Sequence, residues 1–232
     1  MIFPKCQAEI MYRNLIMFIV LLFGFAVFSP AQVCGPGCPV CSGSGQSTGA
    51  LLSPGTLIST VIAIPDGEDE TGVFNFRVGV SSWLDVGLGY SVKSDRFIWS
   101  VRLQPLSENK ESWRPAVIVG TGSVQTGGSD QSAFIQVTKS FEFSENFSAR
   151  FSIGVASLLP DFDQEYFLAG ITMTVTERWS PFFNYDGINY HVGLSWIPYD
   201  WLFVTGLMVE MKNPAIMVGF RWRFDKNVFE DD

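Results

Sequence analysis

Charge is scarce in this chain of 232 residues, and the usual signals of helices are missing. Only 16% of the residues are charged and there is a single histidine, which is little charge for a soluble domain. Helix-favouring runs of Ala, Glu, Lys and Leu are absent, so long helices are not expected. Beyond residue 31, no stretch approaches the roughly eighteen consecutive apolar residues of a membrane helix. If the mature chain crosses a membrane, it must do so as a closed barrel.

The abundant residues favour strands and exclude one class of partner. Phe occurs 21 times and Gly 22 times, a pairing that suits many short strands separated by turns. Lys and Arg together number 15 against 23 Asp and Glu, a net charge of −8. Removing residues 1–31 takes away two basic residues and one acidic residue, which leaves −9. Nucleic acid is therefore excluded as a partner, because its binding needs a basic face.

An apolar run near the N-terminus predicts export. Lys5 and Arg13 precede the apolar stretch 15–27. This stretch has roughly the length of a secretory signal core. Small residues then stand where a signal peptidase reads, so residues 1–31 are predicted to be a signal peptide cleaved after Ala31. An uncleaved anchor is the alternative, but the run is short for a spanning helix and a Ser-Pro pair ends it.

Three cysteines lie in a stretch rich in Gly, Ser and Pro. Residues 32–54 are predicted to be a flexible periplasmic segment. In an oxidising compartment Cys34, Cys38 and Cys41 would form one disulfide and leave one thiol for a periplasmic partner. A metal centre is the alternative, but zinc would need a fourth ligand and the only histidine is far along the chain. We expect no cofactor and no metal site.

From Thr56 onward, apolar residues alternate with small or polar ones. In 74–80 one face is Phe, Phe, Val and Val, and the other is Asn, Arg and Gly. A soluble sandwich would also alternate, but its outer face would carry Lys, Glu and Thr. Here the polar face is mostly Gly, Ser, Asn and Arg, as in a crowded lumen, and the aromatic face suits lipid. Twelve strands are predicted, at about 56–64, 73–81, 84–92, 96–104, 114–122, 132–141, 147–157, 165–175, 179–186, 188–197, 201–211 and 214–224.

These strands predict an all-β fold: one antiparallel up-and-down transmembrane β-barrel over residues 55–224. About twelve strands are expected, with ten as the alternative. An even number returns the C-terminus to the periplasm, where residues 225–232 would form an acidic tail. The predicted location is the outer membrane of a Gram-negative cell, with outer-membrane lipid as the surrounding partner.

The alternation places several charged side chains in the lumen. Unpaired charge there is costly, so they should form pairs and hydrogen-bonded networks. Such a network would either plug the barrel, making a structural or docking protein, or leave a narrow Arg-lined pore that prefers anions. The side chains predicted to face the lumen are Arg77, Asp85, Arg102, Arg150, His191, Arg221 and Arg223.

A weak internal repeat predicts an aromatic belt. Five short polar turns are each followed by an aromatic residue at the start of a strand. If the N-terminus lies in the periplasm, all five turns fall on that side, where interfacial aromatics anchor a barrel. The predicted periplasmic belt consists of Trp83, Trp113, Phe147, Trp179 and Trp201.

The single histidine is the one candidate for catalysis. A general base must touch a hydroxyl that it activates, and a twelve-stranded membrane phospholipase is built on such a Ser/His pair. His191 falls on the lumen side with Ser195, whereas that enzyme acts on lipid from its outer wall. We predict no catalytic residue and no enzyme, and keep a lipid-modifying enzyme as a distant alternative.

The last strand resembles a known assembly signal. Gly219, Trp222 and Phe224 match the Gly-x-x-aromatic-x-aromatic ending that outer-membrane barrels present to their assembly machinery, which the resemblance implies as a partner. Met217 stands where a polar residue is usual, and the chain continues past the final aromatic.

A second resemblance covers about two hairpins. Residues 184–194 with Trp201 and Leu202 look like the barrel repeats of the YjbH-like exopolysaccharide-associated proteins. That resemblance implies a role in polysaccharide export or envelope assembly.

Overall fold

Twelve strands make up the folded part of the chain. The computed structural model describes residues 51–65, 71–109, 111–123, 130–176 and 178–224. No helix in these ranges is long and apolar enough to cross a membrane. The strands are β1 (Thr56–Ala63), β2 (Gly72–Ser81), β3 (Leu84–Ser91), β4 (Arg96–Leu106), β5 (Ala116–Gly122), β6 (Ser132–Ser144), β7 (Phe147–Leu158), β8 (Glu165–Thr174), β9 (Trp179–Tyr185), β10 (Tyr190–Tyr199), β11 (Leu202–Val209) and β12 (Asn213–Arg223).

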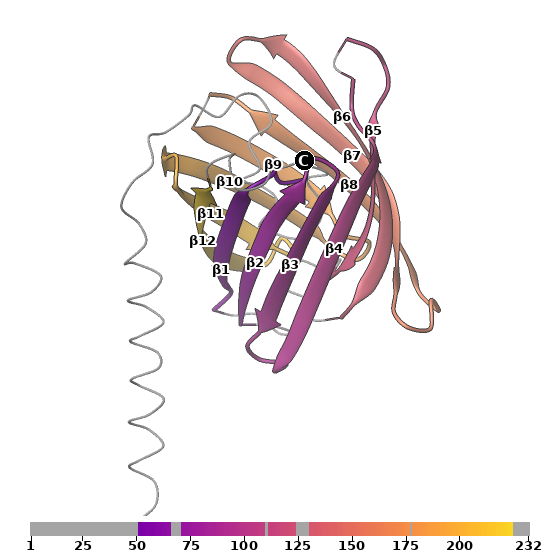
Figure 1. Cartoon of the computed structure of the whole chain (residues 1–232). Coiled ribbons are helices and arrows are strands. Elements are labelled where there is room, and N and C mark those ends of the chain that lie inside the picture. The colour runs from indigo at the N-terminus through magenta and orange to yellow at the C-terminus, as the bar shows by residue number, and fades with distance from the viewer. Residues whose placement is uncertain (1–50, 66–70, 110, 124–129, 177, 225–232) are drawn as a thin grey trace, which may run out of the picture. The chain divides into compact units, whose positions relative to one another are not determined.

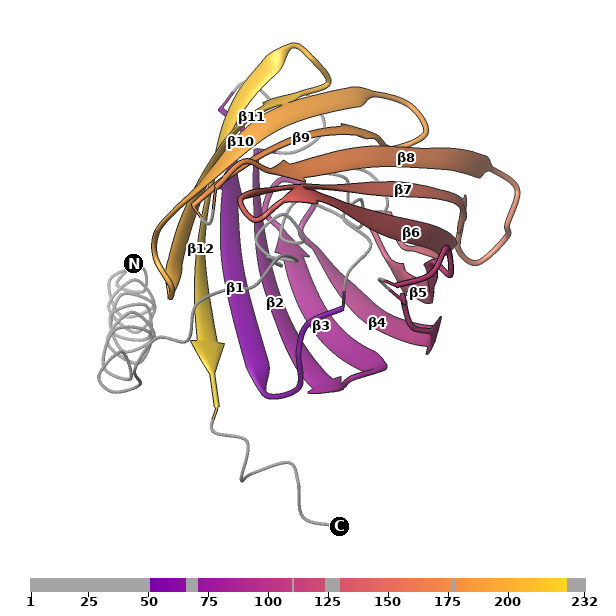
Figure 2. The ribbon, with the colours of Figure 1, turned by 90° about the horizontal axis from the view of Figure 1, so that it is seen from above.

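The sheet closes on itself into a barrel (Figures 1 and 2). Each strand pairs antiparallel with its neighbours in sequence, and β1 pairs with β12 from Thr56 opposite Arg223 to Ala63 opposite Ile216. Closure removes the unpaired edges that an open sheet would expose. The predicted all-β, twelve-stranded antiparallel barrel is confirmed, including the first strand.

The two ends of the barrel differ in their connections. We call the end where β1 begins and β12 ends the entry end, and the opposite one the far end. The entry end carries the turns after β2, β6 and β10 and the connections after β4 and β8, and the far end carries the other connections. The aromatic belt was predicted for the entry end.

Local chemistry fixes where β10 begins. Its predicted start was residue 188, but the Asp186 carboxylate accepts hydrogen bonds from the amides of Ile188 and Asn189 at 3.1 and 2.9 Å. Such a side-chain turn competes with strand pairing. Gly187, with φ of 97°, completes it in a backbone region that favours glycine, and β10 starts at Tyr190.

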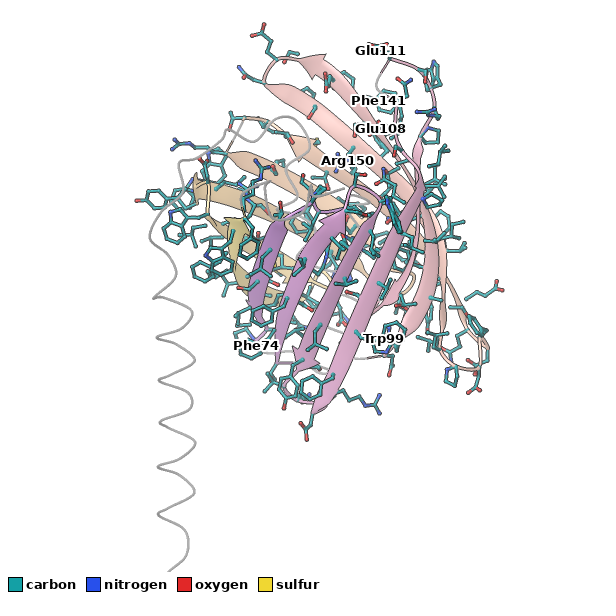
Figure 3. All side chains as sticks on the ribbon, in the orientation of Figure 1. Phe74, Trp99, Glu108, Glu111, Phe141 and Arg150 are labelled. Atoms are coloured by element: carbon teal, nitrogen blue, oxygen red, sulfur yellow. The ribbon has the colours of Figure 1, made fainter. Side chains whose placement is uncertain are left out.

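The outer face is apolar and exposed, as a lipid-facing wall requires. Phe74 on β2 and Trp99 on β4 are 42% and 49% exposed, and Figure 3 shows both on the outside of the barrel. Side chains on the opposite face of the same strands, such as Arg102 on β4, are buried inside. Alternation along each strand therefore separates a lipid-type surface from a filled lumen.

Candidate functional site: the barrel lumen

The lumen near the entry end contains a buried carboxylate held by two arginines. Asp85 on β3 is 0% exposed, and its register partner on β4 is Arg102. Arg102 Nε donates to Asp85 Oδ1 at 2.8 Å, and its Nη2 contacts Oδ2. Arg77 Nη2 on β2 donates to Asp85 Oδ2 at 3.0 Å. Three neighbouring strands are thereby joined through one side chain, and the cluster keeps a formal charge of +1.

The same carboxylate also holds the segment that precedes β1. We call Leu51–Gly55 the strap. The amide of Leu52 donates to Asp85 Oδ2 at 3.1 Å, so the strap lies inside the barrel wall. In Figure 2 the indigo segment before β1 turns back across the ends of β2 and β3.

Other basic side chains near this end also have partners. Arg221 is buried and donates from Nε and Nη2 to the carbonyl of Asp200 at 3.0 and 2.6 Å. Arg150 donates to Ser140 Oγ at 3.0 Å, and that hydroxyl bonds Glu108 Oε2 at 3.0 Å. Figure 3 labels Arg150 and Glu108 at this end.

Arg223 differs from the other predicted lumen residues. It is the last residue of β12 and is exposed. Its register partner, Thr56, is the first residue of β1. Arg223 therefore lies at the rim of the barrel, where water reaches it.

At the far end the lumen holds the single histidine in a fixed tautomer. His191 is 1% exposed. Its Nδ1 accepts the amide of Glu210 at 3.1 Å, and its Nε2 lies 2.8 Å from Asp186 Oδ2. Because Nδ1 accepts, the proton is on Nε2 and is donated to the carboxylate. The ring ties the β9–β10 connection to the turn before β12.

Among the described residues, His191 forms no hydrogen bond with a serine. Ser195 is paired with Thr205 Oγ1 at 2.8 Å, and both nitrogens of His191 are already occupied. A nucleophile must lie within hydrogen-bond reach of its base. Among the described residues, no group of three or more His, Cys, Asp or Glu is placed to hold a metal.

Burial opposes ionisation of Asp186, which lies between β9 and β10. Hydrogen bonds from His191 and from the amides of Asn189 and Ile188, together with the nearby imidazole, outweigh that effect. They hold the pKa of the Asp186 carboxyl below its usual value.

Much of the lumen is apolar, which the sequence pattern did not predict. A buried cluster fills the side formed by β1 and β9–β12. Met217, where barrels usually carry a polar residue, is 0% exposed within it. A signal was present in β11, where, apart from Thr205, the residues 202–209 are apolar or glycine on both faces. The cluster contains Leu52, Ile58, Ile62, Ile64, Phe182, Ile197, Phe203, Leu207, Val209, Ala215 and Met217.

Inward glycines make room for the rings of this cluster. A Cβ at Gly219 would lie 2.0 Å from the Phe203 ring, and one at Gly193 would lie 2.4 Å from the Phe182 ring. The end of each ring therefore lies against a glycine of the neighbouring strand. Gly219, predicted as part of the assembly signal, thus has a packing role as well.

The predicted belt residues are all exposed at the entry end. Two of them continue into ring stacks on the outer wall: Trp179 with Trp196 at 5.8 Å, and Trp201 with Tyr199 at 5.6 Å and Phe220 at 6.0 Å. Their exposed fractions are 55% for Trp83, 84% for Trp113, 37% for Phe147, 41% for Trp179 and 49% for Trp201.

The remaining predicted residues divide into two groups. Trp222 is half-buried and stacks on Phe220 at 5.8 Å, and Phe224 is 49% exposed. Cys34, Cys38 and Cys41 lie outside the described residues, as do the predicted signal peptide and the acidic tail.

No protein-family model matches the chain, and no curated protein matches it in sequence. Among solved structures, the KdgM porin matches with a TM-score of 0.50 at 10% identity, over 73% of this chain and 99% of that one. The Acinetobacter baumannii outer membrane protein Omp33 matches at TM-score 0.41 and 8% identity, over 73% and 97%. The COG4313 outer membrane channel from Pseudomonas putida F1 matches at TM-score 0.41 and 9% identity, over 75% and 97%.

These findings define a class by fold: a closed antiparallel barrel like that of the KdgM porin. They add nothing to the resemblance to YjbH-like proteins at residues 184–194.

Proposed function

We propose that this protein lies in the outer membrane and provides a narrow passage that favours small anions. The carrying observation is the pairing of two arginines, Arg77 and Arg102, with the one carboxylate of Asp85. A basic excess inside a narrow lumen attracts anions and repels cations. Arg221 adds a further buried positive charge near the same end.

The outer surface supports the membrane part of the proposal. Exposed aromatic and aliphatic side chains cover the wall, and rings gather at the entry end, as in a membrane-embedded barrel. Heat-modifiable gel mobility of a detergent-extracted outer-membrane fraction tests it. A chain recovered as a soluble periplasmic protein would overturn the proposal.

Selectivity is tested with the purified barrel in planar bilayers under a KCl gradient. We expect channel steps whose reversal potential favours chloride, and a smaller preference in Arg77→Gln. Arg96→Gln is the matched control, because Arg96 is 61% exposed and pairs with Asp130 at the far end of the barrel, away from the Asp85 cluster. A cation preference, or an absence of steps in every variant, would refute the passage.

A structural barrel with a plugged lumen is the second candidate. It is favoured by the apolar cluster and by the strap, which fill much of the interior. Polysaccharide export remains a prediction from the YjbH-like resemblance alone. It is tested by measuring surface polysaccharide after the gene is deleted.

A further inference from the structure

The strap is bound inside the lumen by contacts that the barrel wall does not need. The hydrogen bonds that Arg77 and Arg102 donate to Asp85 do not involve Leu52. β1 begins only at Thr56 and is paired on both sides, with β2 and β12. Gly55 still bonds both neighbouring strands, through Gly79 and Phe224, whereas residues 51–54 take no part in the pairing of the wall.

A turn at the base of the strap directs it inward. The amide of Thr56 donates to the carbonyl of Ser53 at 3.0 Å, and the amide of Gly55 donates to the carbonyl of Gly79 at 2.9 Å. Gly55 has φ of 70°, which favours glycine. A single tight turn therefore reverses the chain, and a change of a few dihedral angles there would redirect the strap.

Gly79 on β2 provides the space in which the strap lies. A Cβ built there would be 2.2 Å from the carbonyl oxygen of Ser53 and 2.8 Å from that of Leu52. Both contacts are to backbone, so no side-chain rotation relieves them. Strap and inner wall are in direct contact at this point.

The two leucines of the strap contact two different apolar clusters. Leu52 is 1% exposed within the cluster of β1 and β9–β12. Leu51 packs against a second cluster, formed by Ile118, Phe134, Ala156 and Leu168 of β5–β8. The strap therefore joins opposite parts of the wall across the lumen.

The filled lumen buries polar atoms that water would otherwise solvate. Gln136 Nε2 and Oε1, Asn184 Oδ1, and the hydroxyls of Thr56 and Thr60 have no hydrogen-bond partner among the described residues. All four side chains are at most 2% exposed. Leaving such groups unsatisfied is costly, and water that entered the lumen would satisfy them.

We propose that the strap is a plug whose withdrawal from Asp85 and Gly79 opens the passage. This inference rests on the proposed function, because a plug regulates transport only if a passage exists. Withdrawal breaks one hydrogen bond to Asp85, leaves the two arginine pairs intact and exposes their positive charge to the lumen.

Thiol labelling tests the position of the strap. In the full-length chain with Cys6, Cys34, Cys38 and Cys41 changed to Ser, Leu52→Cys reports on the strap. Glu145→Cys, in an exposed turn at the same end, reports free access. We expect a water-soluble maleimide to react with Leu52→Cys at least about tenfold more slowly. Adding Gly79→Ala should bring the two rates close together. Equal rates without Gly79→Ala would overturn the plug.

Conductance tests what the strap does. Gly79→Ala should lengthen or enlarge the channel openings several-fold. Leu52→Asp should do the same, because it places a carboxylate among the apolar side chains that hold Leu52 and alters no strand. Gly206→Ala is the control, since a Cβ there meets nothing within 4 Å. Heat-modifiable mobility verifies that each variant is folded.

The two proposals fail in different ways. If labelling shows the strap released but openings match the unmodified chain, the passage stands and the plug is wrong. If the strap is released and no variant conducts, the passage itself is wrong, and the plug with it.

Discussion

The two ends of the lumen each bury one aspartate, but they satisfy it differently. Asp85 at the entry end is 0% exposed and bonds groups 8, 17 and 33 residues away in the chain. Asp186 at the far end is 5% exposed and bonds groups two, three and five residues away. The Asp85 carboxylate depends on three strands and the strap, and the Asp186 carboxylate depends on a single hairpin. An aspartate therefore joins residues far apart in the sequence at one end, and residues close together in the sequence at the other.

The largest effect should come from Asp85→Ala. It leaves Arg77 and Arg102 without the carboxylate that both contact, and an uncompensated buried charge costs about 3–5 kcal/mol. Urea unfolding of the barrel in detergent, followed by heat-modifiable mobility, measures the loss. A cost no larger than that of Asp186→Ala would break the comparison between the two ends.

Asp186→Asn should cost less, about 1–3 kcal/mol. The amide keeps one acceptor oxygen for the loop but no longer offers a carboxylate to the His191 Nε2–H. Because the partners of Asp186 are local, we expect faster proteolysis in the β9–β10 connection while the remainder stays protected. A modest fall in the urea midpoint of global unfolding, with the added cleavage confined to that connection, is the expected result. Loss of protection throughout the barrel would contradict it.

Acid should lower the stability of the barrel through Asp186 at the far end, by less than either substitution does. The pKa of Asp186 is lowered in the folded protein, so its stabilising contribution is complete above the unfolded value of about 3.9. It is lost as pH falls through the folded pKa below that value. Unfolding midpoints between pH 3 and pH 7 should fall in acid, and less steeply in Asp186→Asn. Parallel profiles for the two proteins would exclude this origin.

Strand positions could be predicted from sequence because alternation is local, whereas the contents of the lumen could not. Parity along β3 puts Asp85 on the face opposite Leu84 and Val86, yet its partners depend on the register of three strands. The bond from Leu52 to Asp85 joins residues 33 apart, and no periodicity encodes it. The apolar side of the lumen was indicated only by β11, where most residues of both faces are apolar. The sequence therefore indicates which face of a strand a side chain occupies, but not which side chains meet inside the lumen.

The smallest effect should come from a third aspartate, Asp130, which tests whether burial explains the difference between the first two. Asp130 accepts a hydrogen bond from Arg96 at 3.0 Å, and their side chains are 53% and 61% exposed. Exposed pairs contribute about 0–1 kcal/mol, and salt screens them. Asp130→Asn should therefore shift the unfolding midpoint slightly in low salt and not at all in 1 M KCl. The Asp85→Ala loss should persist in that salt, because water and ions do not reach the buried carboxylate. Equal salt sensitivity of the two variants would mean that the Asp85 cluster is hydrated, which would also weaken the case for a lumen closed by the strap.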